Sequence, residues 1–187
     1  ILTPIIGIAG TALLCSFGMV MWQTWVLFGV AAFLAGLGIT AGYHRLFSHV
    51  TYNANPIVRF VITMLGSSAF EGSVFEWSSD HRNHHRYVDT EKDPYNINQG
   101  FWYAHMGWLI RLDTSKRDFS NIKDLTASRF LRFQHKYFSW IAAFTGIILP
   151  ALIASLWGNA LAGLIVGGVL RVVVTMHSTF LINSLCH

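Results

Sequence analysis

Two long stretches without charged side chains lie at the ends of this sequence, and they limit what it can fold into. Residues 1–43 contain no Lys, Arg, Asp or Glu, and residues 137–187 contain only Arg171. The segment 44–136 carries all the other charged residues, and 53% of the whole chain is hydrophobic. An apolar, polar, apolar order of this kind is typical of a protein that crosses a membrane, extends into water and enters the membrane again.

The apolar stretches divide into four runs, each close to the roughly 20 residues that a helix needs to cross a bilayer. The runs are residues 1–22, 25–42, 137–157 and 160–182. The polar pair Gln23-Thr24, between two Trp residues, predicts the turn of a first hairpin, and Gly158-Asn159 predicts the turn of a second. Pro150 is expected to kink the third helix. We therefore predict an all-α integral membrane fold with four transmembrane helices in two hairpins.

The polar segment 44–136 is expected to form a helical cap at one membrane surface. The second apolar run ends just before His44 and the fourth ends a few residues before His187, so both hairpins bring histidines to the same side. That side carries the Lys and Arg residues, which predicts that it faces the cytoplasm. Residues 56–74 are apolar but interrupted by charges, and an interfacial helix is expected there rather than a fifth span.

The chain is expected to form one membrane domain over 1–187, with hairpins at 1–43 and 137–187 around the cap. Its formal net charge of +4 suits contact with anionic lipid headgroups, and because no basic run is interleaved with aromatic residues, nucleic-acid binding is not expected. Cys15 and Cys186 lie in apolar surroundings and predict neither a disulfide framework nor a cysteine zinc site.

Five of the nine histidines form two clusters. His44 and His49 make an HxxxxH pattern, and His81, His84 and His85 make an HxxHH pattern. The HxxHH set would share one face of a helix, where it could hold a metal ion or be divided between two. The HxxxxH pair would converge only where a helix ends or bends. Imidazole is a ligand for iron, zinc, copper and nickel, and the lack of Cys ligands argues against structural zinc.

Other residues are expected to pack rather than to react. His105, His135 and His177 have no second histidine at ligand spacing, and we interpret them as ordinary packing or interface residues. Gly38 and Gly42 form a small-xxx-small pair, which is typical of a close contact between two helices.

The two histidine clusters lie within longer motifs. GITAGYHRLFSH covers residues 38–49, and EWSSDHRNHH covers residues 76–85. Further matching segments are Asp93-Pro94, Gly100-Phe101, His105–Trp108, Phe133-Gln134 and Asn183–His187. From about residue 34 to its end, the chain resembles the membrane fatty acyl desaturases of the stearoyl-CoA Δ9 type.

This resemblance implies a pair of non-haem iron ions as the cofactor and O2 as a co-substrate. The implied iron ligands are His44, His49, His81, His84, His85, His187 and, through a water molecule, Asn183. The implied reaction introduces a cis double bond, at Δ9, into a saturated acyl chain. Its partners would be an acyl thioester or acyl lipid, membrane lipids and an external electron donor of the ferredoxin or cytochrome b5 type.

The resemblance also implies a bent acyl tunnel beside the metals. The residues that align with its lining are Glu71, Trp77, Thr179 and Phe180, with Glu and Phe at positions where the animal acyl-CoA enzymes have Gln and Trp. Those enzymes also have an Arg, which meets the CoA headgroup, at the position of Ser79. The acyl carrier is therefore left open between CoA, acyl carrier protein and a membrane lipid. Ordinary helix packing is the alternative role for the tunnel residues.

Metal-ligating imidazoles usually donate their second ring N–H to a carboxylate or amide oxygen. Glu76, Asp80 and Asn83 are the nearest candidates in the sequence, and solvated positions on a helix face are the alternative.

The family has a third histidine box, H-N-x-H-H, which this sequence does not reach. We therefore expect the 187-residue segment to be part of a longer enzyme, to bind metal weakly and to be inactive alone. A lipid or alkane hydroxylase with the same histidine boxes is the alternative function. A metal transporter would place more ionisable side chains inside its spans than Arg171 and His177, and a haem-binding electron carrier would give a Soret band.

Overall fold

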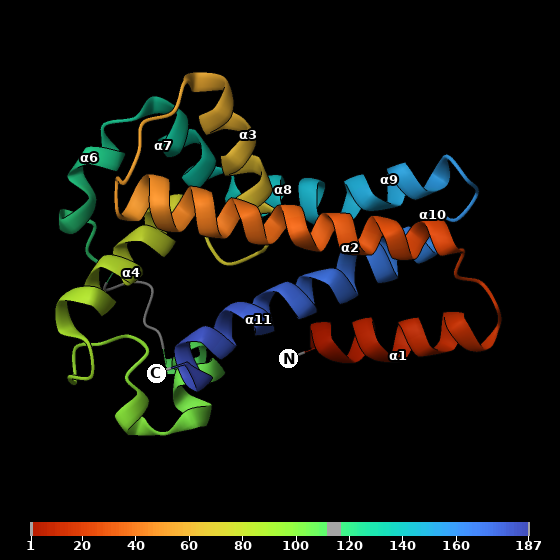
Figure 1. Ribbon diagram of the computed structural model, residues 1–187, viewed down its shortest axis with the longest axis horizontal. Helices are drawn as coiled ribbons and strands as arrows, with labels where there is room; N and C mark the ends of the chain where they lie inside the picture. The colour runs from red at the N-terminus through yellow and green to blue at the C-terminus, as the bar shows by residue number, and fades with distance from the viewer. Residues whose placement is uncertain (1, 112–116, 187) are drawn as a thin grey trace.

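The computed structural model describes residues 2–111 and 117–186, which are helices joined by loops and contain no strand (Figure 1). The predicted all-α class is confirmed for these residues. Three helices are long and apolar enough to cross a membrane: Trp22–Ser48, Phe138–Ser155 and Ala160–Leu185. Each of them combines α-helical and π-helical segments. The segments are α2 (Trp22–Leu37) with η1 (Gly38–Ser48), α8 (Phe138–Ala143) with η6 (Phe144–Ile148) and α9 (Leu149–Ser155), and α10 (Ala160–Ala162) with η7 (Gly163–Leu170) and α11 (Arg171–Leu185).

The first apolar run forms a shorter helix than predicted. Helix α1 (Leu2–Ser16) has 15 residues, fewer than a span usually needs, so four spans are not confirmed. The predicted turn at Gln23-Thr24 is wrong, because the chain turns over residues 17–21, where Gly18 takes a positive φ of 65°, and Thr24 lies inside α2. The second turn was predicted correctly: Gly158, with φ 74°, lies between α9 and α10.

The two turns meet at one end of the helix bundle. Asn159 accepts a hydrogen bond from the Thr24 hydroxyl at 2.7 Å and donates one to the Met19 carbonyl at 2.8 Å. Helix α2 runs from this end past α9 and α11, and the cap helices α3, α4, α6 and α7 gather at the other end (Figure 1). The histidine-rich segments thus lie opposite the two turns.

Pro150 is accommodated by a buried arginine. A proline inside a helix has no N–H to donate to the carbonyl four residues earlier, here that of Gly146, and its ring crowds that carbonyl. The helix takes π geometry over η6 just before Pro150, and the Gly146 carbonyl instead accepts a hydrogen bond from Arg171 Nη2 at 2.6 Å. Arg171 Nη1 donates to the Ser68 carbonyl at 2.7 Å, and the whole side chain is 1% exposed. The one charge of the second apolar stretch therefore joins α11 to η6 and to the end of α3.

The cap consists of short helices around one long one. Its elements are α3 (Pro56–Ser67), α4 (Val74–Tyr87), η2 (Ile97–Gln99), η3 (Tyr103–Gly107), α5 (Trp108–Arg111), η5 (Ser120–Ile122), α6 (Lys123–Thr126) and α7 (Arg129–Lys136). With 12 residues, α3 is shorter than a helix that spans a bilayer, which agrees with the expectation that no fifth span forms there. Its interfacial position remains a prediction.

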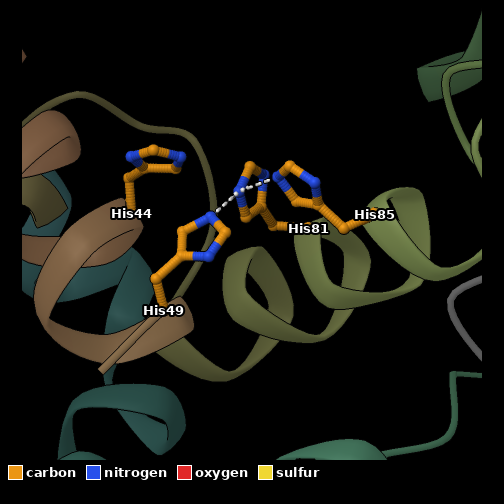
Figure 2. A group of neighbouring side chains, drawn as sticks. All are labelled: His44, His49, His81 and His85. Atoms are coloured by element: carbon orange, nitrogen blue, oxygen red, sulfur yellow. Dashed lines mark hydrogen bonds between the residues drawn. The ribbon is translucent and has the colours of Figure 1, made fainter. Parts of the chain in front are cut away.

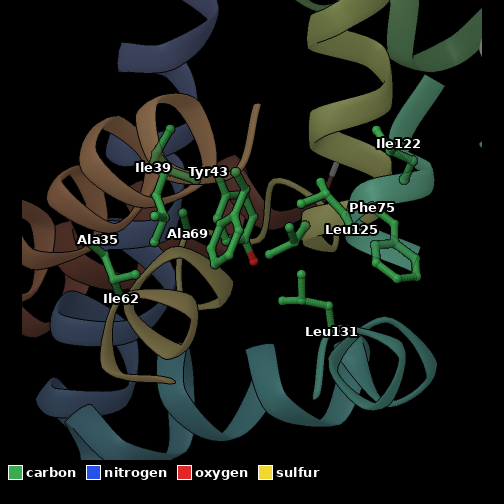
Figure 3. Close-up of a cluster of buried hydrophobic side chains, with 12 residues drawn as sticks. Ala35, Ile39, Tyr43, Ile62, Ala69, Phe75, Ile122, Leu125 and Leu131 are labelled. Atoms are coloured by element: carbon green, nitrogen blue, oxygen red, sulfur yellow. The ribbon is translucent and has the colours of Figure 1, made fainter. Parts of the chain in front are cut away.

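A hydrophobic core joins η1 to the cap (Figure 3). Its members include Tyr43 from η1, Ile62 from α3, Phe75 from α4 and Leu131 from α7. A β-carbon on Gly38 would overlap the backbone of Gly66 in α3, and one on Gly42 would lie 3.1 Å from Cγ1 of Ile62. The predicted helix contact at these two glycines is confirmed, because both need the missing side chain for η1 and α3 to approach.

Candidate metal centre

His44 and His49 converge because η1 is a π-helix. The His49 N–H donates to the His44 carbonyl at 3.0 Å, a bond between residues five apart, as in π rather than α geometry. The two rings consequently lie 4.5 Å apart between their centroids. The helix ends at Ser48, which agrees with the expectation that the pair converges where a helix ends. The π register of its last turns brings the HxxxxH pair onto one face.

The HxxHH cluster lies on α4, whose start is fixed by a capping box. The Ser73 hydroxyl accepts from the Glu76 N–H, and the Glu76 carboxylate accepts from the Ser73 N–H at 2.8 Å. From this start, His81 and His85 are one helical turn apart, and their rings lie 4.5 Å apart. Both project toward the end of η1 (Figure 2).

Four imidazoles meet between these helices (Figure 2). His44, His49, His81 and His85 each offer one ring nitrogen, and these atoms lie within 4.8 Å of one another. His81 Nε2 is 3.0 Å from His49 Nε2 and 3.1 Å from His85 Nε2. A neutral imidazole has one N–H and one lone pair, so three converging Nε2 atoms cannot all be satisfied by hydrogen bonds to each other. A cation that accepts their lone pairs fits this donor set, and nitrogen ligands suit iron or zinc.

The electrostatics keep His81 in the form that binds metal. Burial, reinforced by the neighbouring histidines, lowers the pKa of His81 to about 2. The ring is therefore neutral at physiological pH, and its lone pair is available. His49 and His85 are exposed, whereas His44 and His81 are half-buried, so the cluster opens toward the surface on one side.

His84 lies outside this group of four but has the partner that a metal ligand usually has. Its Nδ1 is 2.8 Å from Oδ1 of Asp93, and both side chains are buried. A carboxylate on one ring nitrogen fixes the tautomer and leaves the other nitrogen as the acceptor. Sequence reasoning missed Asp93 in this role, although the Asp93-Pro94 match had marked the position.

The three residues expected to support the ligands have other partners. Glu76 and Asp80 form ion pairs with Arg117 at 2.9 and 2.6 Å, and Asn83 accepts from the Asn121 amide at 3.0 Å. That these side chains orient the histidines stays a prediction. Arg117 was not singled out from the sequence, because its position next to α4 comes from the fold.

The other histidines lie away from the group of four or beyond the described residues. His187 lies outside the described residues. His135 Nδ1 is 2.7 Å from the Ser73 hydroxyl at the start of α4. His105 and His177, which have no partner nearby in the sequence, meet in space, with Nε2 and Nδ1 at 3.0 Å.

Two cavities lie beside the histidines, one on each side of Trp77 and Thr179. The first, of about 300 Å³, extends under the cap and includes Glu71 and Phe180. The second, of about 390 Å³, lies between α2–η1 and α11 and has a mainly apolar lining. Both have volumes usual for small-molecule sites. The residues that line both cavities are Trp77, His81, Thr179 and Asn183.

Glu71 holds the two residues that separate the cavities. Its carboxylate accepts hydrogen bonds from the Thr179 hydroxyl at 2.7 Å and from Trp77 Nε1 at 3.2 Å. Burial raises the pKa of Glu71 to about 7, against the opposing effect of these two hydrogen bonds. Three of the four predicted tunnel residues therefore form one connected group, and Phe180 packs nearby against Trp108, with ring centroids 6.3 Å apart.

Comparison with known proteins is consistent with this site. The family model for fatty acid desaturases matches residues 20–187. A probable acyl-CoA desaturase of Schizosaccharomyces pombe is 49% identical over 155 residues, which cover 82% of this chain and 32% of the relative. Stearoyl-CoA desaturase 4 of Mus musculus is 39% identical, over 88% of this chain and 48% of the relative. An acyl-CoA Delta(11) desaturase of Spodoptera littoralis is also 39% identical, over 89% and 51%.

The chain thus spans between about a third and a half of the length of these relatives. The family model nevertheless covers both histidine motifs, all three long apolar helices and the residues between the cavities. This chain belongs to the fatty acid desaturase family.

Proposed function

We propose that the protein containing this chain is an O2-dependent acyl desaturase that introduces a cis double bond into a saturated acyl chain, at Δ9. The observation that carries the proposal is the convergence of four imidazoles beside two cavities that share His81. A metal next to a mainly apolar cavity is what oxidation of an unactivated hydrocarbon chain needs.

The proposed ligands are the four converging histidines, with His84, His187 and, through water, Asn183. We include His84 because its ring is bound to Asp93, as metal-ligating histidines usually are to a carboxylate. We include Asn183 because it lines both cavities, as His81 does. Two iron ions bound there would supply the redox chemistry by which O2, two external electrons, two protons from solvent and two hydrogens of adjacent methylenes give the alkene and two water molecules. The residues of this chain hold the ions and position the acyl chain.

The substrate would occupy both cavities and bend between them. Trp77 and Thr179, held by Glu71, form the narrow junction, and His81 lines the space on either side. An acyl chain bent at this point presents two neighbouring methylenes on one side to the metal, as a cis product requires. The second cavity, between α2 and α11, would take the apolar end of the chain.

The proposed carrier is coenzyme A, as the names of the relatives suggest. The Arg of the animal enzymes is absent here, and Ser79, which replaces it, is buried and bonded to Asn121 and to the Asp118 carbonyl. Arg117 lines the first cavity, where its charge is paired with those of Glu76 and Asp80. A membrane position with the histidines on the cytoplasmic side, and a ferredoxin or cytochrome b5 type of electron donor, complete the proposal.

The test uses the full-length protein in a host without its own desaturase, supplied with a suitable reductase. Cellular fatty acids are analysed by gas chromatography and mass spectrometry, with derivatisation that locates the double bond. We expect new cis-9 monoenes, which are lost in His81→Ala and His84→Ala but retained in His177→Asn, a change at a histidine that is not among the proposed ligands. A double bond at another position would correct the regiochemistry.

Hydroxylated chains without alkenes would assign the protein to the hydroxylase alternative, which uses the same histidine boxes. An unchanged fatty acid profile from a folded, metal-loaded protein would rule out this substrate class.

A further inference from the structure

The relative position of the two ligand-bearing helices depends on one side chain that is not itself a ligand. Arg82 lies on α4 between His81 and His84, and its guanidinium binds backbone carbonyls at the end of η1. Its Nε donates to the Ser48 carbonyl at 3.0 Å, and its Nη2 donates to the Phe47 carbonyl at 2.8 Å. These two carbonyls immediately precede His49.

The same guanidinium also binds η5 and α6. Nη1 donates to the Asn121 carbonyl and to Asp124 Oδ1, both at 2.8 Å, and Nη2 donates to Asp124 Oδ2 at 2.9 Å. A guanidinium has five N–H donors in a planar fork, and all five have an acceptor here. Hydrogen bonding from Arg82 also lowers the pKa of Asp124, which keeps this carboxylate charged.

The Phe47 and Ser48 carbonyls belong to the end of a helix, where carbonyl groups have no partner within the helix. Arg82 supplies those partners from α4, so the end of η1 is bonded to the helix that carries His81 and His85. The contact is extended by the Ser48 hydroxyl, which donates to the Ser78 hydroxyl at 3.0 Å. We propose that Arg82, held by Asp124, is a positioning residue that sets the distance between the two halves of the histidine cluster. This inference rests on the metal site proposed above.

A lysine cannot replace this side chain, because its ammonium is a point charge with three donors and cannot reach five acceptors in one plane. Arg82→Lys therefore retains the charge but loses the geometry. The chain offers a matched control in Arg171, which also donates to two helix carbonyls, those of Ser68 and Gly146, but in the middle of the bundle.

The experiment titrates Co²⁺ into the metal-free, full-length protein and follows its visible absorption, which reports both affinity and ligand geometry. Thermal unfolding is measured for each variant. We expect Arg82→Lys to weaken Co²⁺ binding about tenfold, within the range for residues behind metal ligands, and to alter the spectrum. Asp124→Asn should show a smaller effect of the same kind. Arg171→Lys should lower the unfolding temperature but leave the Co²⁺ affinity and spectrum unchanged.

If Arg82→Lys binds Co²⁺ with the same affinity and spectrum as the unaltered protein, the inference is overturned and the proposed function is left intact. An equal loss of affinity in Arg82→Lys and Arg171→Lys would also overturn it, because the effect would then follow from general destabilisation. If the unaltered protein itself binds no Co²⁺, or if His81→Ala binds it equally well, the proposed metal site fails and this inference fails with it.

Discussion

At the residue scale, Glu71 is a buried carboxyl group that binds two other side chains between the cavities. Its two carboxylate oxygens hold Trp77 and Thr179 at the junction of the two cavities. A glutamate in this position is costly to ionise, because burial disfavours the charged form more than the two donors favour it. The side chain that shapes the junction is thus also the one whose charge depends on pH.

The stability of the folded protein should therefore fall as pH rises through the pKa of Glu71. The pKa is about 7 when folded, against a reference of 4.5, so between these values the folded state retains a proton that the unfolded state has lost. Glu71→Gln removes this dependence. We expect the variant and the unaltered protein to unfold at similar temperatures near pH 4.5, and the variant to be more stable above pH 7, by up to about 3 kcal/mol. A difference that does not change with pH would contradict this assignment.

At the scale of elements, two π-helical segments solve problems of geometry that a regular α-helix could not. In η1 it brings residues five apart onto one face, and in η6 it accommodates Pro150. The segment η1 needs a neighbouring helix that can approach it closely, and η6 needs a donor for its displaced carbonyl group. Gly66 of α3 allows the close approach to η1, and Arg171 donates to the Gly146 carbonyl of η6.

The contact between η1 and α3 should tolerate no side chain at Gly38. Gly38→Ala places a methyl group on the Gly66 backbone, which cannot move aside as a flexible side chain can. We expect a loss of about 1–3 kcal/mol in stability, as for other overpacked cores, together with weaker metal binding because His44 lies on the same helix. Gly29→Ala is the matched control, since nothing lies within 4 Å of its added carbon. Thermal unfolding of both variants in the full-length protein checks the prediction, and equal unfolding temperatures would refute it.

At the scale of the whole molecule, the three long apolar helices place the two turns at one end and the histidine cluster with the cap at the other (Figure 1). Because the charged residues gather around the cap, the two ends of the bundle differ sharply in polarity. This polarity underlies the proposed orientation in the membrane.

That orientation can be measured with single cysteines on exposed residues at the two ends. Met19→Cys marks the turn after α1, and Ala127→Cys marks the cap between α6 and α7. In a full-length protein without other cysteines, an impermeant maleimide should label Met19→Cys in intact cells and Ala127→Cys only in inside-out vesicles. The reverse pattern would place the histidines on the outer face, and labelling of both in intact cells would argue against membrane spanning.

The helical class, the polar segment between apolar ends, the family and the clustered histidines could all be predicted from the order of the amino acids. These follow from local patterns, because hydropathy, charge and motif spacing act over a few turns of chain. The sequence also predicted that Gly38 and Gly42 would form a helix contact, since small residues at this spacing have few other uses. It misplaced the first turn, because the boundary of an apolar helix is weakly marked where both sides are apolar.

Which side chains meet depends on how the helices pack in three dimensions. Asp93 reaches His84, Arg117 takes the carboxylates of Glu76 and Asp80, and His105 finds His177 across 72 positions of the sequence. The approach of His44 to His81 depends on a π register that no local pattern marked. Contacts of this kind are set by how helices pack, because burial forces each polar side chain to find a partner among whatever the fold places nearby.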